Sequence, residues 1–186
     1  MRPNILFIMS DDHASKAISA YGHGINQTPG IDRIANEGMR LDHCYVTNSI
    51  CGPSRAVIQT GKHSHKNGFM NNGNNFDGSQ QTFPKLLQAA GYQTAAVVSN
   101  VVLTREAIGL STRFDHYDDF VDEREQSLDV YERRASRTSD AAIKWLRELR
   151  DTGRPHFLWV HYIDPHGPYE APADADANFQ HQGSQE

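Results

Sequence analysis

Short runs of apolar residues along the chain predict strands. Residues 4–10, 93–99 and 156–163 are almost wholly apolar, which is typical of strands buried on both faces of a parallel sheet. Residues 39–46 contain fewer apolar positions, but their pattern predicts a further strand. Cys44 is expected to lie in the core as part of this strand. We therefore expect these segments to form the centre of the fold.

Between these runs, apolar positions three and four residues apart predict helices. Thr28 and Pro29 suit the N-cap and first turn of a helix over 28–38, and a second helix is expected over 82–90. A longer helix is expected over 131–150, with its charged residues facing solvent. This alternation predicts an α/β fold, in which a mostly parallel sheet with right-handed crossovers is flanked by helices.

Composition narrows the class of protein. The 186 residues are 38% hydrophobic and 22% charged, which suits a globular protein. The net charge of −5, without a basic stripe, gives no reason to expect a nucleic-acid partner, and the acidic segment 114–125 is interpreted as a solvated loop. No apolar run reaches the length of a membrane span, and residues 4–9 are too few for a signal-peptide core. Neither a transmembrane segment nor a signal peptide is therefore expected in this sequence. Two cysteines make no disulfide framework.

The segment 49–62 predicts a helix that has a cysteine at its start. Pro53 suits the first helical turn, and Gly61 suits a helix end. Cys51 would therefore lie at the positive end of the helix dipole, with the fixed charge of Arg55 close by. Such a place favours an anion, whether a thiolate, a sulfate or a phosphate.

Two adjacent acids, Asp11 and Asp12, follow the first apolar run. Ligands in open α/β sheets bind beyond the carboxyl ends of the strands. Neighbouring carboxylates repel one another unless a cation lies between them, so the pair suggests a hard divalent metal. His166 follows the last run and is flanked by Pro165 and Pro168, whereas His161 alternates within that run and is expected to be a packed core histidine.

These features resemble one known family. The segment Cys51-x-Pro-Ser-Arg followed by Thr-Gly-Lys62, the strand Pro-Asn-Ile-Leu followed by two aspartates, and Pro-His166-x-Pro-Tyr are similar to motifs of the type I, formylglycine-dependent sulfatases. The resemblance implies the alkaline-phosphatase-like fold. It also implies hydrolysis of a sulfate ester, with a sulfated carbohydrate as the substrate class.

The resemblance further implies a set of site residues and cofactors. Cys51 would be oxidised to formylglycine by a sulfatase-maturation enzyme, and Asp11, Asp12 and residue 51 would bind Ca²⁺. Arg55 would hold the formylglycine, Lys62 would support the region of the nucleophile, and His166 would assist at the ester oxygen of the leaving group.

One position departs from the family pattern. Many sulfatases carry Gly-Lys-x-His after the strand that matches 93–99, and this chain has Asn100 near the expected lysine. Asn100 can donate hydrogen bonds to a sulfate but brings no charge. The chain either takes a different substrate or compensates through Lys62, His65 or Arg105.

The resemblance covers residues 1–186 as the N-terminal part of a sulfatase catalytic domain, with later calcium ligands and a later lysine missing. We therefore expect a fold that is incomplete at its C-terminus, and a periplasmic or extracellular location is plausible by resemblance. Three alternatives stay open. They are a phosphonate or phosphodiester hydrolase of the same superfamily, a thiol enzyme that uses unmodified Cys51, and a truncated remnant without catalysis.

Overall fold

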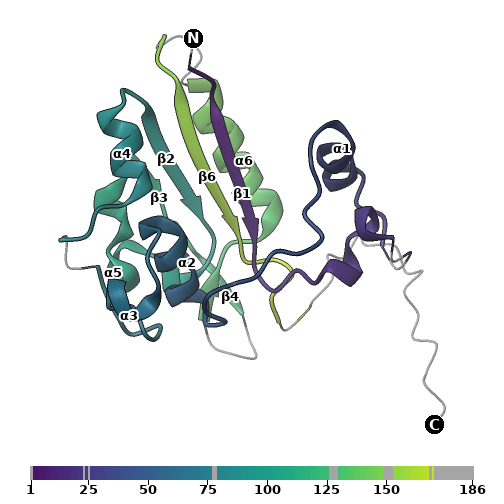
Figure 1. Ribbon diagram of the computed structural model, residues 1–186, viewed down its shortest axis with the longest axis horizontal. Helices are drawn as coiled ribbons and strands as arrows, with labels where there is room; N and C mark the ends of the chain where they lie inside the picture. The colour runs from purple at the N-terminus through teal and green to yellow at the C-terminus, as the bar shows by residue number, and fades with distance from the viewer. Residues whose placement is uncertain are drawn as a thin grey trace.

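The centre of the fold is a four-stranded parallel sheet with helices on both faces (Figure 1). The computed structural model describes residues 2–22, 24, 26–76, 79–125, 130–148, 153–167 and 169. Across the sheet the strands follow the order β1 (Ile5–Ser10), β6 (His156–Tyr162), β2 (Gln93–Val98) and β3 (His116–Asp118). A separate antiparallel pair is formed by β4 (Glu123–Glu125) and β5 (Val130–Glu132). The predicted α/β fold with a mostly parallel sheet is thus confirmed.

Helices and short 3-10 turns connect these strands. The α-helices are α1 (Pro29–Glu37), α2 (Cys51–Thr60), α3 (Ser64–Asn67), α4 (Phe83–Ala89), α5 (Arg105–Ile108) and α6 (Ala135–Glu148). The 3-10 turns are η1 (Ser15–Ala17), η2 (Ser19–Tyr21), η3 (Val101–Leu103) and η4 (Leu110–Arg113). None of the helices among the described residues has the length and apolar character needed to cross a membrane.

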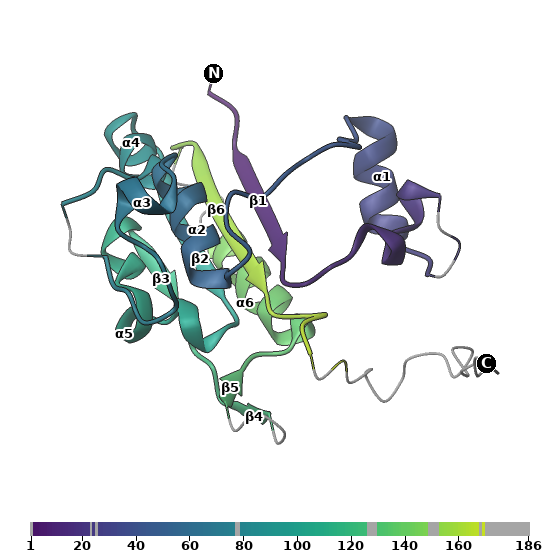
Figure 2. The ribbon, with the colours of Figure 1, turned by 60° about the horizontal axis from the view of Figure 1, so that its bottom comes forward.

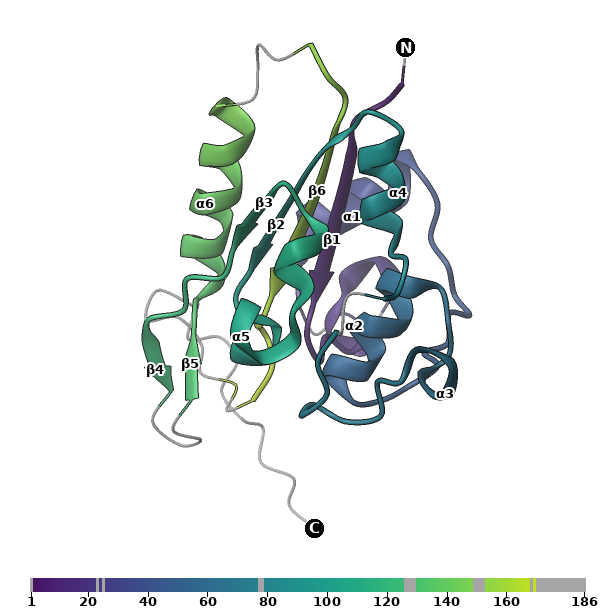
Figure 3. The ribbon, with the colours of Figure 1, turned by 90° about the vertical axis from the view of Figure 1, so that its left-hand side faces the viewer.

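The two central strands, β2 and β6, send alternate side chains to two separate cores. One face of the sheet packs on α6, and the other is covered by α2, α4 and α5 (Figure 3). The core on the α6 side contains Ala95, Val97, Ala142, Trp145, Leu158 and Val160. The core on the opposite side includes Ala56, Phe69, Ala96, Val98, Phe157 and Trp159. Both faces are buried, which explains why these strands are nearly continuous apolar runs.

The first strand was expected to be buried, and this expectation is wrong for one of its faces. Phe7 and Met9 pack against the core beneath α2 and α4, but Leu6 and Ile8 face the side of α6 and are exposed. They stand in register with Leu158 and Val160 of β6. Because α6 covers β2 and β6, it leaves the neighbouring edge strand open on that face (Figure 1).

The segment 39–46 does not form the predicted strand. It leads from α1 towards α2 without regular structure, and its side chains are exposed, including that of Cys44. Among the described residues no strand lies beside it to satisfy a hydrogen-bond ladder, so its apolar residues alone do not make it a strand. The placement of Cys44 in the core was therefore wrong.

The helix α1 has the predicted bounds, but it stands apart from the sheet (Figure 2). It has no buried residue and lies against η2. Its apolar residues, whose spacing predicted a helix packed in the fold, are therefore largely exposed. The Thr28 side chain does not cap the helix backbone. Its hydroxyl oxygen instead accepts the backbone N–H of Ser19 at 3.0 Å, and the hydroxyl donates to Asp32 Oδ1 at 3.1 Å.

Two further expectations around α6 need correction. The helix begins at Ala135, because residues 130–132 pair with β4 instead, and its predicted end at 149–150 lies outside the described residues. Arg133, expected on the solvent-exposed face, is buried and pairs with Asp118 at 2.8 Å. The segment 114–125 accordingly is not a solvated loop, because it contains β3 and β4 and supplies carboxylates to arginines.

Candidate active site

The carboxyl ends of β1 and β6 and the start of α2 enclose a cavity of about 520 Å³. Parallel strands end at the same edge of the sheet, so side chains far apart in sequence meet there. The lining combines most of the residues singled out from the sequence with the segment that precedes α2. It consists of Ser10, Asp11, Asp12, Val46, Asn48, Ser49, Ile50, Cys51, Ser54, Arg55 and His166.

Cys51 is the first residue of α2, as the sequence predicted. Ile50 is extended at the N-cap position, and Gly61 ends the helix in the left-handed conformation at φ 64°. The Cys51 Sγ atom lies 3.2 Å from Nδ2 of Asn72, whose Oδ1 accepts the backbone N–H of Gly52 at 2.9 Å. A side-chain methyl at Gly52 would come within 2.8 Å of that oxygen. The glycine therefore permits Asn72 to lie over the cysteine.

Arg55 is held inside the protein by two partners, one just after β1 and one on β6. Its Nη2 atom is 3.1 Å from Asp11 Oδ1, and its Nε atom donates to His161 Nε2 at 3.1 Å. All three side chains are buried. A buried guanidinium must be paired to be tolerated, and here the residue after β1 supplies the carboxylate and β6 supplies the imidazole.

His161 is a core histidine, as predicted, but it is also part of this network. Because its Nε2 atom accepts from Arg55, the proton of the neutral ring lies on Nδ1. Burial, together with the nearby Arg55 charge, lowers the pKa of His161 to about 3. The ring is therefore neutral at physiological pH and serves as an acceptor for the guanidinium.

Asn100, which stands near the family's lysine position, also reaches the network. Its Nδ2 atom donates to Asp11 Oδ2 at 3.3 Å, and its Oδ1 accepts the backbone N–H of Val102 at 3.0 Å. A smaller hollow of about 190 Å³ is lined by Asn100, Cys51 and His166 among others. Asn100 thus lines a hollow together with the cysteine, and it is a neutral amide where the family pattern has a cation.

Asp12 and His166 face one another across the mouth of the cavity. Asp12 has φ 47°, a left-handed conformation that costs a non-glycine residue free energy and often marks a functional site. Its Oδ2 atom lies 3.7 Å from His166 Nε2. The His166 Nδ1 atom lies 2.9 Å from the Gly167 carbonyl, which can only accept, so Nδ1 carries a proton. Nε2 is then the nitrogen that can exchange a proton at the cavity.

The carboxylate oxygens at this cavity are ligands of the type that calcium prefers, but they are too few to complete its coordination shell. Asp11 and Asp12 both line the cavity and present the carboxylate oxygens that Ca²⁺ prefers. Among the described residues, however, no group of three or more Asp, Glu, His or Cys side chains is arranged to hold a metal. A calcium ion takes about six to eight oxygens, so most of its shell would have to come from elsewhere.

Other predicted residues lie outside this cavity. Lys62 follows the far end of α2, which at about 1.5 Å per residue is roughly 15 Å from Cys51. His65 is on α3, with its ring 5.9 Å from that of His63. Arg105 pairs with Asp119 at 2.7 Å and lines a different cavity. The structure therefore brings together Asp11, Asp12, Cys51, Arg55, Asn100 and His166, and it does not bring Lys62, His65 or Arg105 to them.

Sequence reasoning missed two residues of the site. Asn72 lies in a segment rich in glycine and asparagine, in which no periodicity marks the asparagine that contacts Cys51. His161 was placed in the core without a partner. A signal for it was present, because a polar ring inside a buried apolar strand needs a hydrogen-bonding group nearby.

Comparisons with known proteins identify the family of this chain. The N-acetylglucosamine-6-O-sulfatase of Bacteroides thetaiotaomicron is 46% identical over 179 residues, which are 89% of this chain and 31% of that protein. Arylsulfatase H of Canis lupus familiaris is 34% identical over 127 residues, 62% of this chain and 22% of that protein. The solved structure of BT4656 in complex with its substrate D-glucosamine-2-N,6-O-disulfate matches with a TM-score of 0.75 and 41% identity.

The match to BT4656 covers 91% of this chain and 36% of the solved one. The chain therefore spans about a third of the length of BT4656 and of the N-acetylglucosamine-6-O-sulfatase. The family described as Sulfatase matches residues 3–186. The chain belongs to the sulfatase family.

Proposed function

We propose that this chain carries the nucleophile end of a sulfuric ester hydrolase that removes a sulfate from a glucosamine-type sugar. The observation that carries the proposal is the meeting of Cys51, Arg55, Asp11, Asp12 and His166 around one cavity. The relatives support the substrate class, because one is named for N-acetylglucosamine 6-sulfate and another was solved with a sulfated glucosamine.

In this proposal, the residues around the cavity have different roles in the reaction. The N-terminal turn of α2 and the Arg55 guanidinium supply positive potential where the sulfate would lie beside residue 51. His166, with a proton fixed on Nδ1, can donate a second proton from Nε2 to the leaving sugar oxygen. Asn100 can donate an amide hydrogen bond near the sulfate without adding charge.

Two groups complete the proposal. A formylglycine made from Cys51 by a maturation enzyme would supply an oxygen nucleophile, and a Ca²⁺ ion held by Asp11, Asp12 and residue 51 would supply Lewis-acid stabilisation of charge. The supporting role that the resemblance gives Lys62 would have to act through α2, because Lys62 lies beyond the far end of that helix.

The first test is the mass of the peptide that contains Cys51, from protein produced with and without a maturation enzyme. Conversion of the thiol to the aldehyde lowers the mass by about 18 Da, the net change from CH₂–SH to CHO. An aldehyde only in the presence of the enzyme supports the proposal. A persistent thiol would leave the formylglycine mechanism without its nucleophile and favour a thiol enzyme or a non-catalytic chain.

The second test compares esters on the converted protein. A 6-sulfate and a 6-phosphate of N-acetylglucosamine are offered to wild type, Arg55→Ala, His166→Ala and the exposed control Lys144→Ala. We expect hydrolysis of the sulfate by wild type and Lys144→Ala, with losses in the other two. Preference for the phosphate would instead favour the related phosphate or phosphonate chemistry, which the neutral Asn100 keeps plausible.

Calcium is tested by its binding alone. A ligand that binds only the folded state raises stability by about 2.7 kcal/mol at a hundred times its dissociation constant. We expect Ca²⁺ to raise the unfolding midpoint of wild type, Asp12→Asn to remove most of this rise, and Asp140→Asn on α6 to retain it. No rise in wild type would mean that these two carboxylates hold no calcium by themselves.

A further inference from the structure

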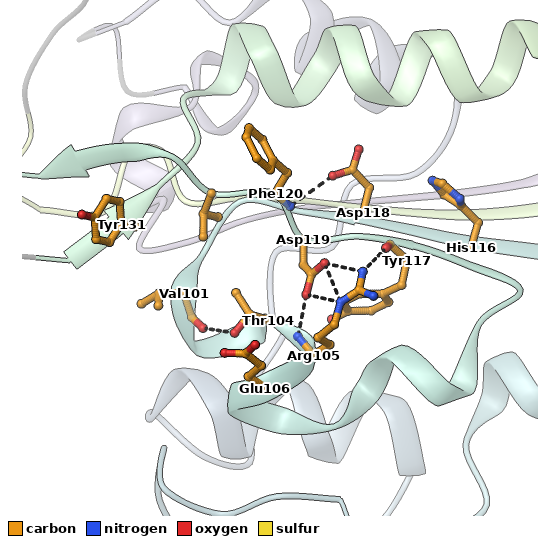
Figure 4. Close-up of a pocket in the computed structure, with 11 residues that line it drawn as sticks. Val101, Thr104, Arg105, Glu106, His116, Tyr117, Asp118, Asp119, Phe120 and Tyr131 are labelled. Carbon is orange, nitrogen blue, oxygen red and sulfur yellow. Dashed lines mark hydrogen bonds and ion pairs between the residues drawn. The ribbon is translucent and has the colours of Figure 1, made fainter.

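A second cavity, of about 580 Å³, lies between β3 with the segment that follows it and the turn formed by η3 and α5 (Figure 4). Its volume is in the range of small-ligand sites, about 300–1,000 Å³. Nothing in the proposed sulfate chemistry uses it. The question is therefore whether this cavity is connected with the catalytic one and what it could hold.

The two cavities are adjacent, because they share lining residues. Val101 and Tyr131 line the larger cavity and also the small hollow that contains Cys51 and His166. The pairing of Asn100 with Glu132 keeps β5 beside η3, so Tyr131 stands between the two spaces. A molecule that placed one end at Cys51 could extend past Tyr131 into the larger cavity.

The lining of the larger cavity suits a sugar ring. Phe120 and Tyr131 are 62% and 49% exposed, so their rings are available to pack against the C–H face of a pyranose. Thr104 and Glu106 lie on the turn formed by η3 and α5, opposite the segment that carries Phe120, and add a hydroxyl and a carboxylate group for sugar hydroxyls (Figure 4). An apolar body with several polar groups is the composition of a typical ligand site.

The charges of this cavity exclude a second sulfate. Arg105 is the single lysine or arginine among the lining residues, and Asp119 holds it, with Nη2 to Oδ1 at 2.7 Å and Nε to Oδ2 at 3.1 Å. Glu106 adds a further carboxylate to the lining, whereas the carboxylate of Asp118 is paired with Arg133 at 2.8 Å. An anionic ring would therefore meet the charge of Glu106, with the single arginine of the lining already paired, whereas an uncharged ring would meet no such repulsion.

We propose that this cavity is a subsite for an uncharged sugar linked to the sulfated one, so that the preferred substrate is an oligosaccharide in which only the unit at Cys51 carries sulfate. This proposal rests on the proposed function for the identity of the first unit. The position of Tyr131 between the two spaces is what links them.

The test measures the binding of three sugars to the folded chain by NMR titration. They are N-acetylglucosamine 6-sulfate, a disaccharide that joins it to an uncharged sugar, and the same disaccharide with a sulfate on the second sugar. We expect the uncharged extension to tighten binding about tenfold, a typical gain for one aromatic contact with hydrogen bonds, and to shift the resonances of Phe120 and Tyr131. The second sulfate should abolish this gain.

Variants separate a subsite from a general loss of structure. Phe120→Ala, at an exposed position, should reduce the disaccharide to the affinity of the monosaccharide, whereas Tyr131→Phe should retain the gain. Asp119→Asn frees Arg105 and should make the doubly sulfated disaccharide bind better than it binds wild type. Equal affinities of wild type for all three sugars, or a Phe120→Ala loss shared by the monosaccharide, would overturn the proposal.

The same titration keeps the two proposals apart. Binding of the monosaccharide with no gain from the extension would disprove the subsite and leave the proposed function standing. If the uncharged extension perturbs Phe120 and Tyr131 while the monosaccharide does not bind, the subsite is supported and the proposed function is contradicted.

Discussion

Two neighbouring strands, β6 and β1, show how similar sequences acquire different surroundings. Both are short apolar runs in parallel register, and Leu158 of β6 stands directly beside Leu6 of β1 on the same face of the sheet. Leu158 is 1% exposed and Leu6 is 55% exposed, because α6 covers one strand and not the other. Apolar composition thus predicts that a strand forms, whereas its burial depends on which helix the topology places over it.

The largest expected difference comes from making the same substitution on both strands. Leu158→Ala leaves a cavity beneath α6 and should lower the free energy of unfolding by about 2–5 kcal/mol. Leu6→Ala removes a half-exposed side chain and should cost about 1 kcal/mol or less. Urea unfolding of both variants gives the comparison. Equal losses would mean that the exposed face of β1 is covered in solution.

A smaller effect is expected where β6 delivers a polar group. His161→Phe removes the acceptor of Arg55 Nε and leaves a buried donor unsatisfied, which should cost about 1–3 kcal/mol. His161→Gln retains an acceptor and should cost less. Chemical denaturation of both variants is the measurement. A loss in His161→Phe no larger than that in His161→Gln would show that the hydrogen bond to Arg55 contributes little to stability.

His161 also predicts a dependence of stability on pH. Its pKa is about 3 in the folded state, below the usual value of about 6.5, so the unfolded chain binds the extra proton first as pH falls. Stability from this group is complete above about pH 6.5 and should fall by roughly 1 kcal/mol per pH unit between there and pH 3. His161→Gln should flatten this slope, and the exposed control His43→Gln should not. An unchanged slope in His161→Gln would assign it to other groups.

The smallest effect is expected at the isolated helix α1. Arg33 and Glu37 form an i,i+4 pair at 2.8 Å on its exposed surface. Glu37→Gln should change the free energy of unfolding by no more than about 0.5 kcal/mol, because solvent screens exposed pairs. Thermal unfolding at low and high salt checks this. A large salt-sensitive loss would indicate that α1 packs against a further surface.

The features of the fold and the site that could be predicted from the sequence are those that depend on residues close together in the chain. Cys51 at a helix start and Asp11 after a strand follow from residue types within a few positions, and the structure places both as expected. The contact of Asn72 with Cys51 arises from a loop 21 residues away, which no periodicity encodes. The segment 39–46 was misjudged because strand formation requires a neighbouring strand, which local sequence does not reveal.

The burial of α2 has a consequence for the order of events in time. Pro53 and Arg55 belong with Cys51 to the segment Cys-x-Pro-Ser-Arg that resembles the sulfatase motif, and both are buried in the folded protein. An enzyme that recognises these side chains before it oxidises the cysteine cannot reach them once α2 has packed onto the sheet. Under the proposed function, each molecule therefore has a limited interval after synthesis in which it can become active, and the rate of folding determines how long that interval lasts.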